Sequence, residues 1–161
     1  MGVSDFDDFY ATHRERLLRL CWLLTLDKDV AAELAQETMT KAWKNWDSIS
    51  TPGSNPLAWS NKVAVNLSSN RRRKLGSRRR WGHLFVPAET TPAPSEYHDL
   101  AQALRRLPPR QRQAIVLRYW NDLDLAGCAD VMGVSVGSVK THLSRAHATL
   151  REAGELVLED S

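Results

Sequence analysis

The chain has 161 residues, of which 42% are hydrophobic and 25% charged, and a formal net charge of +3 at pH 7. These proportions exclude a wholly disordered protein, and the length allows one ordinary domain or two small helical ones. The longest apolar run, Leu20–Leu26, is too short to cross a bilayer, and the chain does not open with a signal-peptide pattern. We therefore expect a cytoplasmic protein without membrane insertion.

Two helices are predicted before residue 50, because apolar residues recur there at three- and four-residue steps. The apolar stripe of the first helix consists of Phe6, Phe9, Tyr10, His13, Leu17, Leu20 and Leu24. Asp29 is suited to cap the second helix, which we expect to end before the Pro52-Gly53 break. The apolar faces of that helix are expected from Ala32, Leu34, Ala35, Met39, Ala42, Trp43 and Trp46.

A third helix is expected from Asn55, whose side chain can cap it, with Pro56 at the first helical position. It leads into a basic run that contains Arg71, Arg72, Arg73, Lys74, Arg78, Arg79 and Arg80. This concentration of positive charge predicts a polyanionic partner.

Prolines, paired threonines and small residues change the character of the chain after Gly76, which indicates a flexible linker. Helical periodicity returns near Tyr97, and Pro108 and Pro109 separate the first two helices of a second unit. The predicted fold class is all-α, with two small helical domains, the second a four-helix unit. The boundaries are 1–75 for the first domain, 76–97 for the linker, 98–152 for the second domain and 153–161 for an acidic tail.

The last two predicted helices have the spacing of a helix-turn-helix. Asp124 can cap the first, Gly133 allows a tight turn, and Ser135 can cap the second. Helical periodicity places Val139, Leu143, Ala146 and Leu150 on one face, and Gly137, Lys140, Thr141, Ser144, Arg145 and Ala148 on and beside the opposite face. This outer face is typical of a major-groove reader, with the solvated face of an ordinary helical hairpin as the alternative.

Enzyme chemistry has no support in the sequence, which lacks a phosphate-cradling glycine loop, a nucleophile motif and a cluster with metal-ligand spacing. His142 and His147 are five residues apart and do not share a helical face. Cys21 and Cys128 stand among apolar helical residues, as buried free thiols do. We therefore expect no catalytic residue, no metal and no cofactor.

Several segments, taken in order, resemble a known family. AAELAQETMTKAWKNW, Ala31 to Trp46, and NPLAWSNKVAVNLSSNRRRK, Asn55 to Lys74, resemble the second conserved region of bacterial extracytoplasmic-function sigma factors. RRLPPRQRQAIVLRYWNDL, Arg105 to Leu123, and the helix-turn-helix resemble the fourth region. The run that contains Val65, Asn66 and Arg71 to Arg73 resembles the short actinobacterial subgroup of that family.

The resemblance implies a transcription initiation factor that binds core RNA polymerase and promoter DNA. The polymerase-docking residues it implies are Glu33, Leu34, Gln36, Glu37, Thr38 and Lys41. The resemblance also implies residues that contact and open the downstream promoter element. They are Trp59, Lys62, Asn66, Ser69, Asn70, Arg71, Arg72 and Arg73. The upstream element would be read by Ser135, Ser138, Lys140, Thr141, Ser144 and Arg145. Among these we expect Arg145 to contact a guanine and Lys140 a phosphate.

Two further readings stay open at this stage. The segment VGSVKTHLSRA, Val136 to Ala146, also resembles the output domain of response regulators, so a self-sufficient helix-turn-helix regulator is the alternative function. That regulator would need a receiver domain, whereas the N-terminal half shows no strand-helix alternation. An anti-sigma factor that holds the chain inactive is a further expected partner.

Overall fold

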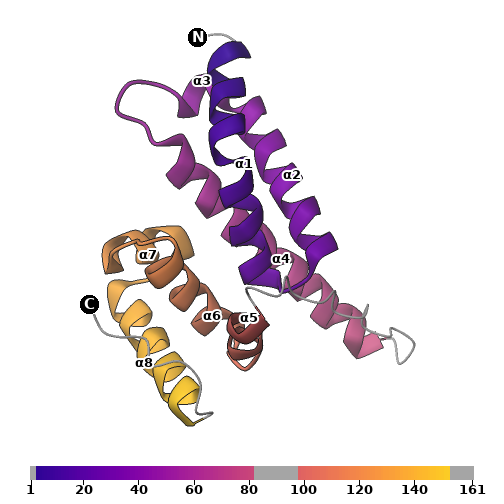
Figure 1. Ribbon diagram of the computed structural model, residues 1–161, viewed down its shortest axis with the longest axis vertical. Coiled ribbons are helices and arrows are strands. Elements are labelled where there is room, and N and C mark those ends of the chain that lie inside the picture. Colours follow the sequence, from indigo (N-terminus) through magenta and orange to yellow (C-terminus); the bar gives the residue numbers. More distant parts are fainter. Residues whose placement is uncertain (1–2, 82–97, 153–161) are drawn as a thin grey trace. The chain divides into compact units, whose positions relative to one another are not determined.

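The computed structural model describes residues 3–81 and 98–152, and the chain divides into two compact units, Met1–Thr91 and Pro92–Ser161 (Figure 1). Every regular element in the described residues is a helix, which confirms the predicted all-α class with two helical domains. The predicted acidic tail and most of the predicted linker lie outside the described residues.

The first unit contains α1 (Val3–Thr25), α2 (Lys28–Lys44), the short α3 (Trp46–Ile49) and α4 (Pro56–Trp81). Helices α1, α2 and α4 all pack against one another, and Figure 1 shows α1 and α2 running side by side. Their shared core is made of fully buried side chains, among them Leu17, Leu20, Leu23, Leu34 and Val65. Burying an aliphatic side chain of this size contributes about 1.5 to 3 kcal/mol, so this core is the main source of stability in the unit.

The cap of α2 differs from the prediction. Asp27, in an extended conformation, accepts hydrogen bonds from the backbone N–H groups of Asp29 and Val30 at 3.0 and 3.1 Å. Asp29 lies inside the first helical turn, where a carboxylate still interacts favourably with the helix dipole. Both aspartates are good capping residues, and the turn at Leu26, with φ of 55°, decides which of them precedes the helix.

An aromatic cluster closes one end of the first unit. The ring of Trp46 in α3 lies 5.4 Å from that of Phe6 and 5.1 Å from that of Phe9, measured between ring centroids. Trp43, which we had placed on an apolar face of α2, instead exposes 58% of its surface. The prediction was wrong for Trp43, because periodicity orders residues around a helix without telling how far a neighbouring helix covers them.

Helix α4 begins as predicted, with Pro56 at its first position and Asn55 Oδ1 accepting the Ala58 N–H at 3.0 Å. It continues to Trp81, past the residue 76 at which we had expected the linker. A single helical glycine such as Gly76 costs only about 1 kcal/mol, and the arginines that follow it are good helix formers. The linker was expected to start at residue 76, but the helix continues through Trp81.

The second unit contains α5 (His98–Arg105), α6 (Pro109–Ile115), α7 (Leu125–Met132) and α8 (Val136–Glu152). Helix α6 runs on into a π-helical segment, η2 (Val116–Trp120). Helices α6, α7 and α8 contact one another, and Pro108 and Pro109 stand at the start of α6 as predicted.

Both cysteines are buried free thiols, as predicted. Cys21 packs in the first unit and Cys128 in the second, each with 0% exposure. Burial raises the pKa of the Cys21 thiol to about 12 and that of the Cys128 thiol to about 11. Because the thiolate is the reactive form, neither residue is suited to nucleophilic or redox chemistry.

Candidate nucleic-acid and polymerase interfaces

The helix-turn-helix of the second unit is built from local contacts that the sequence predicts. Asp124 Oδ1 accepts the Gly127 N–H at 2.6 Å at the start of α7. Gly133 ends α7 with φ of 67°, a left-handed conformation that favours glycine. Ser135 Oγ then accepts the Ser138 N–H at 3.1 Å and caps α8. All three predicted turn residues have the role expected of them.

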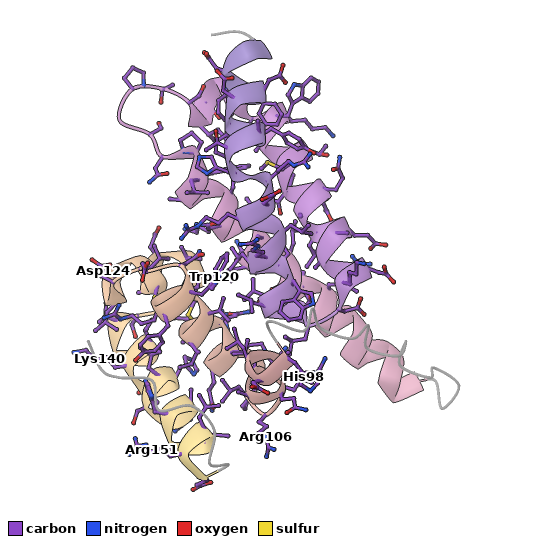
Figure 2. All side chains as sticks on the ribbon, in the orientation of Figure 1. His98, Arg106, Trp120, Asp124, Lys140 and Arg151 are labelled. Carbon is purple, nitrogen blue, oxygen red and sulfur yellow. The ribbon has the colours of Figure 1, made fainter. Side chains whose placement is uncertain are left out.

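The two faces of α8 separate as its periodicity predicts. The buried side is formed by Val139, Leu143, Ala146 and Leu150. The exposed side contains Gly137, Lys140, Thr141, Ser144, Arg145 and Ala148, and Figure 2 labels Lys140 on this helix. A solvent-facing strip of small, polar and basic side chains is what a major-groove reader needs.

Local hydrogen bonds divide the six predicted upstream-element residues into two groups. The Ser135 hydroxyl donates to Ser138 Oγ at 3.0 Å, and the Thr141 hydroxyl donates to the Gly137 carbonyl at 3.1 Å. The side chains of the other three predicted residues make no hydrogen bond or ion pair within the described part of the chain: Lys140, Ser144 and Arg145. This second group has its donors available for DNA.

Arg110 supports the turn from a distant position, a role that the sequence analysis missed. Its Nη1 donates to the carbonyl of Met132, the last residue of α7, at 3.1 Å and to Gln113 Oε1 at 3.0 Å. Since cationic donors satisfy the free carbonyls at a helix C-terminus, Arg110 holds the end of α7 against α6. The only signal in the sequence was its place in the segment that resembles the fourth region.

The two histidines of α8 do not combine into a metal site. His147 Nε2 lies 2.9 Å from the Tyr119 hydroxyl, while burial and the nearby Arg110 and Arg145 lower the pKa of His142. No group of three potential metal-ligating side chains occurs among the described residues. Likewise, none of the helices in residues 3–81 and 98–152 combines the length and apolar character that a membrane span requires.

In the first unit, α2 presents four of the six predicted polymerase-binding residues on its surface: Glu33, Gln36, Glu37 and Lys41. The other two are not available. Leu34 is 1% exposed, and Thr38 is 0% exposed with its hydroxyl donating to the Leu34 carbonyl at 2.7 Å. Their side chains pack in the core and hold α2 in place.

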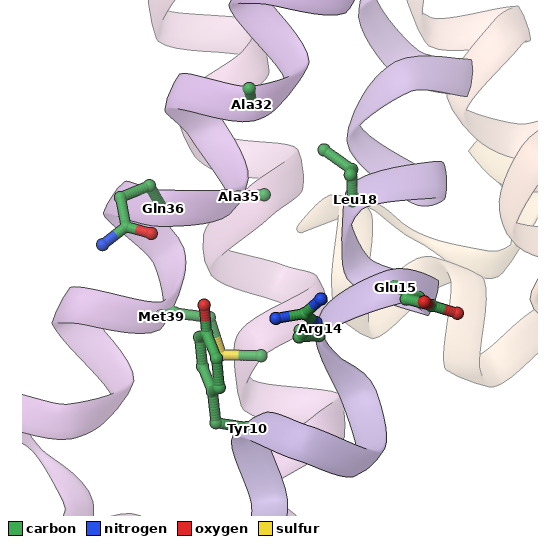
Figure 3. A pocket seen from close by; sticks show the side chains of 8 residues that line it. All are labelled: Tyr10, Arg14, Glu15, Leu18, Ala32, Ala35, Gln36 and Met39. Atoms are coloured by element: carbon green, nitrogen blue, oxygen red, sulfur yellow. The ribbon is translucent and has the colours of Figure 1, made fainter. Parts of the chain in front are cut away.

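Two further features adjoin this face of α2. A groove of about 300 Å³ runs between α1 and α2 (Figure 3). Its lining consists of Tyr10, Arg14, Glu15, Leu18, Ala32, Ala35, Gln36 and Met39. The exposed indole of Trp43 stands seven residues after Gln36, and so lies on the same side of α2 two turns further along.

Helix α4 carries the predicted downstream-element residues in a regular strip. Lys62, Asn66 and Asn70 are exposed and spaced four residues apart, so their side chains follow one another along one side of the helix. Trp59, Ser69 and Arg71 are half-buried beside this strip. Arg72 and Arg73 lie on α4, but their side chains are outside the described part of the structure.

One ion pair joins the two faces of the first unit. Arg71 Nη2 on α4 donates to Glu33 Oε2 on α2, across 38 residues of sequence. The side chains remain 37% and 63% exposed, respectively, so water still reaches both charges. In the free chain, Glu33, which is predicted to contact polymerase, is therefore paired with Arg71, which is predicted to contact DNA.

Comparison with known proteins agrees with this architecture. Residues 9–78 match the model of sigma-70 region 2, and residues 97–150 match that of sigma-70 region 4. The chain is 31% identical to the RNA polymerase sigma-E factor of Streptomyces coelicolor, over 98% of this chain and 89% of that one. It is 32% identical to the sigma-E factor of Streptomyces avermitilis, over 93% and 85% of the two chains.

A solved structure shows the same fold. The sigma factor RpoE of Bartonella quintana, crystallised with the anti-sigma factor NepR, matches with a TM-score of 0.80 and 29% sequence identity. The match covers 93% of this chain and 96% of that one. CnrH, solved in complex with the cytosolic domain of CnrY, has a TM-score of 0.68 at 21% identity and supports the fold alone.

Two helical units in this order, the second with a DNA-binding helix-turn-helix, define a sigma-type transcription factor rather than an enzyme. The chain belongs to the extracytoplasmic-function (ECF) family of RNA polymerase sigma factors, and directs transcription initiation. Members of this family bind core RNA polymerase and promoter DNA. The alternative of a self-sufficient regulator is not supported, because the match to sigma-70 region 2 covers most of the first unit.

Proposed function

We propose that three surfaces of this sigma factor divide the work of initiation. The exposed face of α2 docks on core RNA polymerase, the strip along α4 contacts and opens the downstream promoter element, and the outer face of α8 reads the upstream element. The observation that carries the proposal is the separation of faces: in α2 and α8, exposed polar residues alternate at helical spacing with buried ones. Such faces leave polar side chains exposed to solvent, where another molecule can reach them, and on α2 only Glu33 has a partner from another helix in the described residues, Arg71.

The docking surface comprises Glu33, Gln36, Glu37, Lys41 and Trp43. The carboxylates and the lysine supply charge-assisted hydrogen bonds to a helical partner, and they set the orientation of docking. Trp43 adds a large apolar anchor, since an exposed tryptophan is the type of side chain that dominates binding energy at interfaces. Leu34 and Thr38 contribute indirectly by anchoring α2 in the core.

On α4, the amides of Asn66 and Asn70 offer both donors and acceptors to a base edge. Lys62 and the arginines from Arg71 onward bring positive charge to the phosphates of the strand. Opening the duplex costs a few kcal/mol per unstacked base, and contacts with an extruded base and with phosphates offset that cost. Trp59 is half-buried in the free chain, so part of its surface is packed and part is accessible beside the strip.

On α8, the proposal assigns Arg145 to a guanine edge and Lys140 to a phosphate, with Ser144 between them. The guanidinium can donate two parallel hydrogen bonds to guanine O6 and N7. Ser135 and Thr141 act mainly within the helix, because their hydroxyl protons are already used in local bonds.

The cellular setting follows from the partners. Since core polymerase and promoter DNA are its partners, we place the protein in the cytoplasm. The structural relative RpoE was crystallised with an anti-sigma factor, and we propose that a protein of that kind also binds this chain.

The decisive experiment is transcription of fragmented genomic DNA by sigma-free core polymerase, with and without this protein, followed by mapping of the 5′ ends. We expect discrete starts that appear only with the protein and are preceded by two shared sequence blocks. A stable complex with core but no discrete starts would contradict the promoter-reading part of the proposal. Absence of any complex with core would contradict the docking surface.

A further inference from the structure

The first turn of α8 carries an exposed apolar side chain that none of the surfaces above uses. Val136 exposes 39% of its surface, and with Leu18 and Trp43 it is one of three large hydrophobic side chains exposed to this degree among the described residues. The core beneath α8 is filled by other side chains from Val139 onward, so Val136 is not needed for packing. Its place is at the N-terminal end of the helix-turn-helix reading helix.

The residues on either side of Val136 do not cover its side chain, which is exposed at the first turn of α8. Ser135 is occupied with capping, and its hydroxyl donates to Ser138 Oγ. Gly137 has no side chain, and a Cβ built there would meet only Ser135 Oγ, at 3.8 Å. The backbone at Gly137 can therefore approach DNA closely, and Val136 projects beside it.

The chemistry of the major groove limits what an apolar side chain can bind there. The base edges present acceptors on guanine, adenine and thymine and donors on adenine and cytosine, and the one apolar group among them is the thymine C5-methyl. Reading helices of the helix-turn-helix class contact base edges through their N-terminal residues. An apolar residue at this position is therefore matched to thymine.

We propose that Val136 is a specificity-determining residue that selects a thymine in the upstream promoter element through contact with its C5-methyl group. The inference rests on the proposed function of α8 and deepens it, because the hydrogen-bonding ends of Lys140, Ser144 and Arg145 are suited to polar base edges and phosphates rather than to a methyl group. Lys140 stands one turn after Val136 on the same side of the helix, so a phosphate contact there would bring Val136 toward the groove.

The test uses promoter DNA in which deoxyuridine replaces thymine, which removes only the methyl group. With holoenzyme assembled from the full chain and core polymerase, each thymine of the upstream element, on either strand, is replaced in turn, and open-complex formation is measured. We expect one position to lose about three- to fivefold in apparent affinity, the effect of one buried methyl group. With Val136→Ala, the thymine promoter should lose a similar factor, and deoxyuridine at that position should then have no further effect.

Ser144→Ala provides the matched control, since it removes a polar reader from the same helix and should keep the full deoxyuridine effect. Alanine is a better helix former than valine, so circular dichroism of the Val136→Ala protein should match the wild type. An unchanged deoxyuridine effect in Val136→Ala, or no effect at any thymine with the wild-type chain, would overturn the inference. Failure of the wild-type holoenzyme to start at any promoter would instead count against the proposed function, so the two failures are distinguishable.

Discussion

Gly127 is a glycine inside a helix, where glycine is normally unfavourable, and the N-terminal cap of α7 explains its presence. Glycine inside a helix costs about 1 kcal/mol relative to alanine, yet Gly127 stands in the first turn of α7. Its N–H donates to Asp124 Oδ1 at 2.6 Å, and a Cβ built on Gly127 would lie 3.1 Å from that same oxygen. The absence of a side chain allows the close cap that starts the helix-turn-helix.

Arg112 is a buried charge that holds two helices together. It is 8% exposed, and its Nε donates to the Leu104 carbonyl at 3.0 Å while Nη2 donates to the Leu107 carbonyl at 3.4 Å. Both acceptors lie at or just beyond the C-terminal turn of α5, and the Leu104 carbonyl also accepts the Leu107 N–H at 3.1 Å. The guanidinium thereby ties the end of α5 to α6.

We predict that Arg112→Ala lowers the free energy of unfolding of the second unit by about 2 to 4 kcal/mol, because it removes a buried side chain, the guanidinium donor to the Leu107 carbonyl and one of two donors to the Leu104 carbonyl. The measurement is urea unfolding of the full chain followed by circular dichroism. Arg151→Ala, at an exposed position in the last turn of α8, serves as the control and should change stability by less than about 0.5 kcal/mol. Equal losses of stability in the two variants would contradict the stabilising role of Arg112 between α5 and α6.

His142 gives the second unit a pH dependence whose sign can be worked out. Burial, followed by the charges of Arg110 and Arg145, lowers the pKa of His142 in the folded state below its ordinary 6.5. The unfolded chain then binds the proton more readily, so stability is complete above pH 6.5 and falls as the pH drops through that value toward the folded pKa.

Replacement of His142 by glutamine should therefore reduce the loss of stability between about pH 7.5 and about pH 5.5. Urea unfolding midpoints at the two pH values measure the effect. His98→Gln, at the exposed start of α5, controls for loss of an imidazole elsewhere in the unit. An identical pH dependence in wild type and His142→Gln would show that His142 does not carry the effect.

At the scale of elements, the contact between α2 and α4 joins residues of two proposed interfaces. Glu33 belongs to the proposed docking surface and Arg71 to the proposed DNA strip, and in the free chain they form an ion pair. Exposed pairs of this kind contribute at most about 1 kcal/mol. The carboxylate cannot serve Arg71 and a polymerase residue fully at the same time, so docking and release of Arg71 are linked.

We expect Arg71→Gln to tighten binding to core polymerase by about two- to fivefold, because it frees Glu33, and we expect no such gain when Glu33 is already glutamine. Binding of labelled protein to core polymerase without DNA measures both variants. Asn70→Ala, an exposed neighbour in the same strip, is the control and should leave polymerase affinity unchanged. Additive effects of Glu33→Gln and Arg71→Gln would rule the linkage out.

At the scale of the whole molecule, the proposed function requires that the two units of one chain engage two promoter elements together. Binding of the first unit raises the effective concentration of the second near its own element, and the gain is lost when the geometry forbids simultaneous contact. The distance between the two elements should therefore affect initiation as strongly as their sequences do.

Insertion of five base pairs between the two elements turns one of them by about half a helical turn relative to the other. We predict that initiation by the holoenzyme then falls at least about tenfold, measured as transcript from the mapped start. The same five base pairs inserted upstream of both elements should have no effect. Equal activity of the two altered promoters would argue against simultaneous reading.

The sequence alone predicted the all-helical class, the order of the two domains, and the helix caps and the turn of the helix-turn-helix. Asn55, Asp124, Gly133 and Ser135 act where they were expected, because caps and turns depend on residues only a few positions apart. The buried face of α8 was predictable for the same reason. Its periodic stripe is long and has a single phase.

Tertiary structure alone decided which residues of α2 face outward and which distant residues meet. It buried Thr38 and exposed Trp43, because coverage of a helix depends on where its neighbours cross it. It also paired Glu33 with Arg71 and placed Arg110 on the end of α7. Contacts between side chains so far apart in sequence arise only when the packed core sets the helices against one another, and local patterns carry no information about that packing.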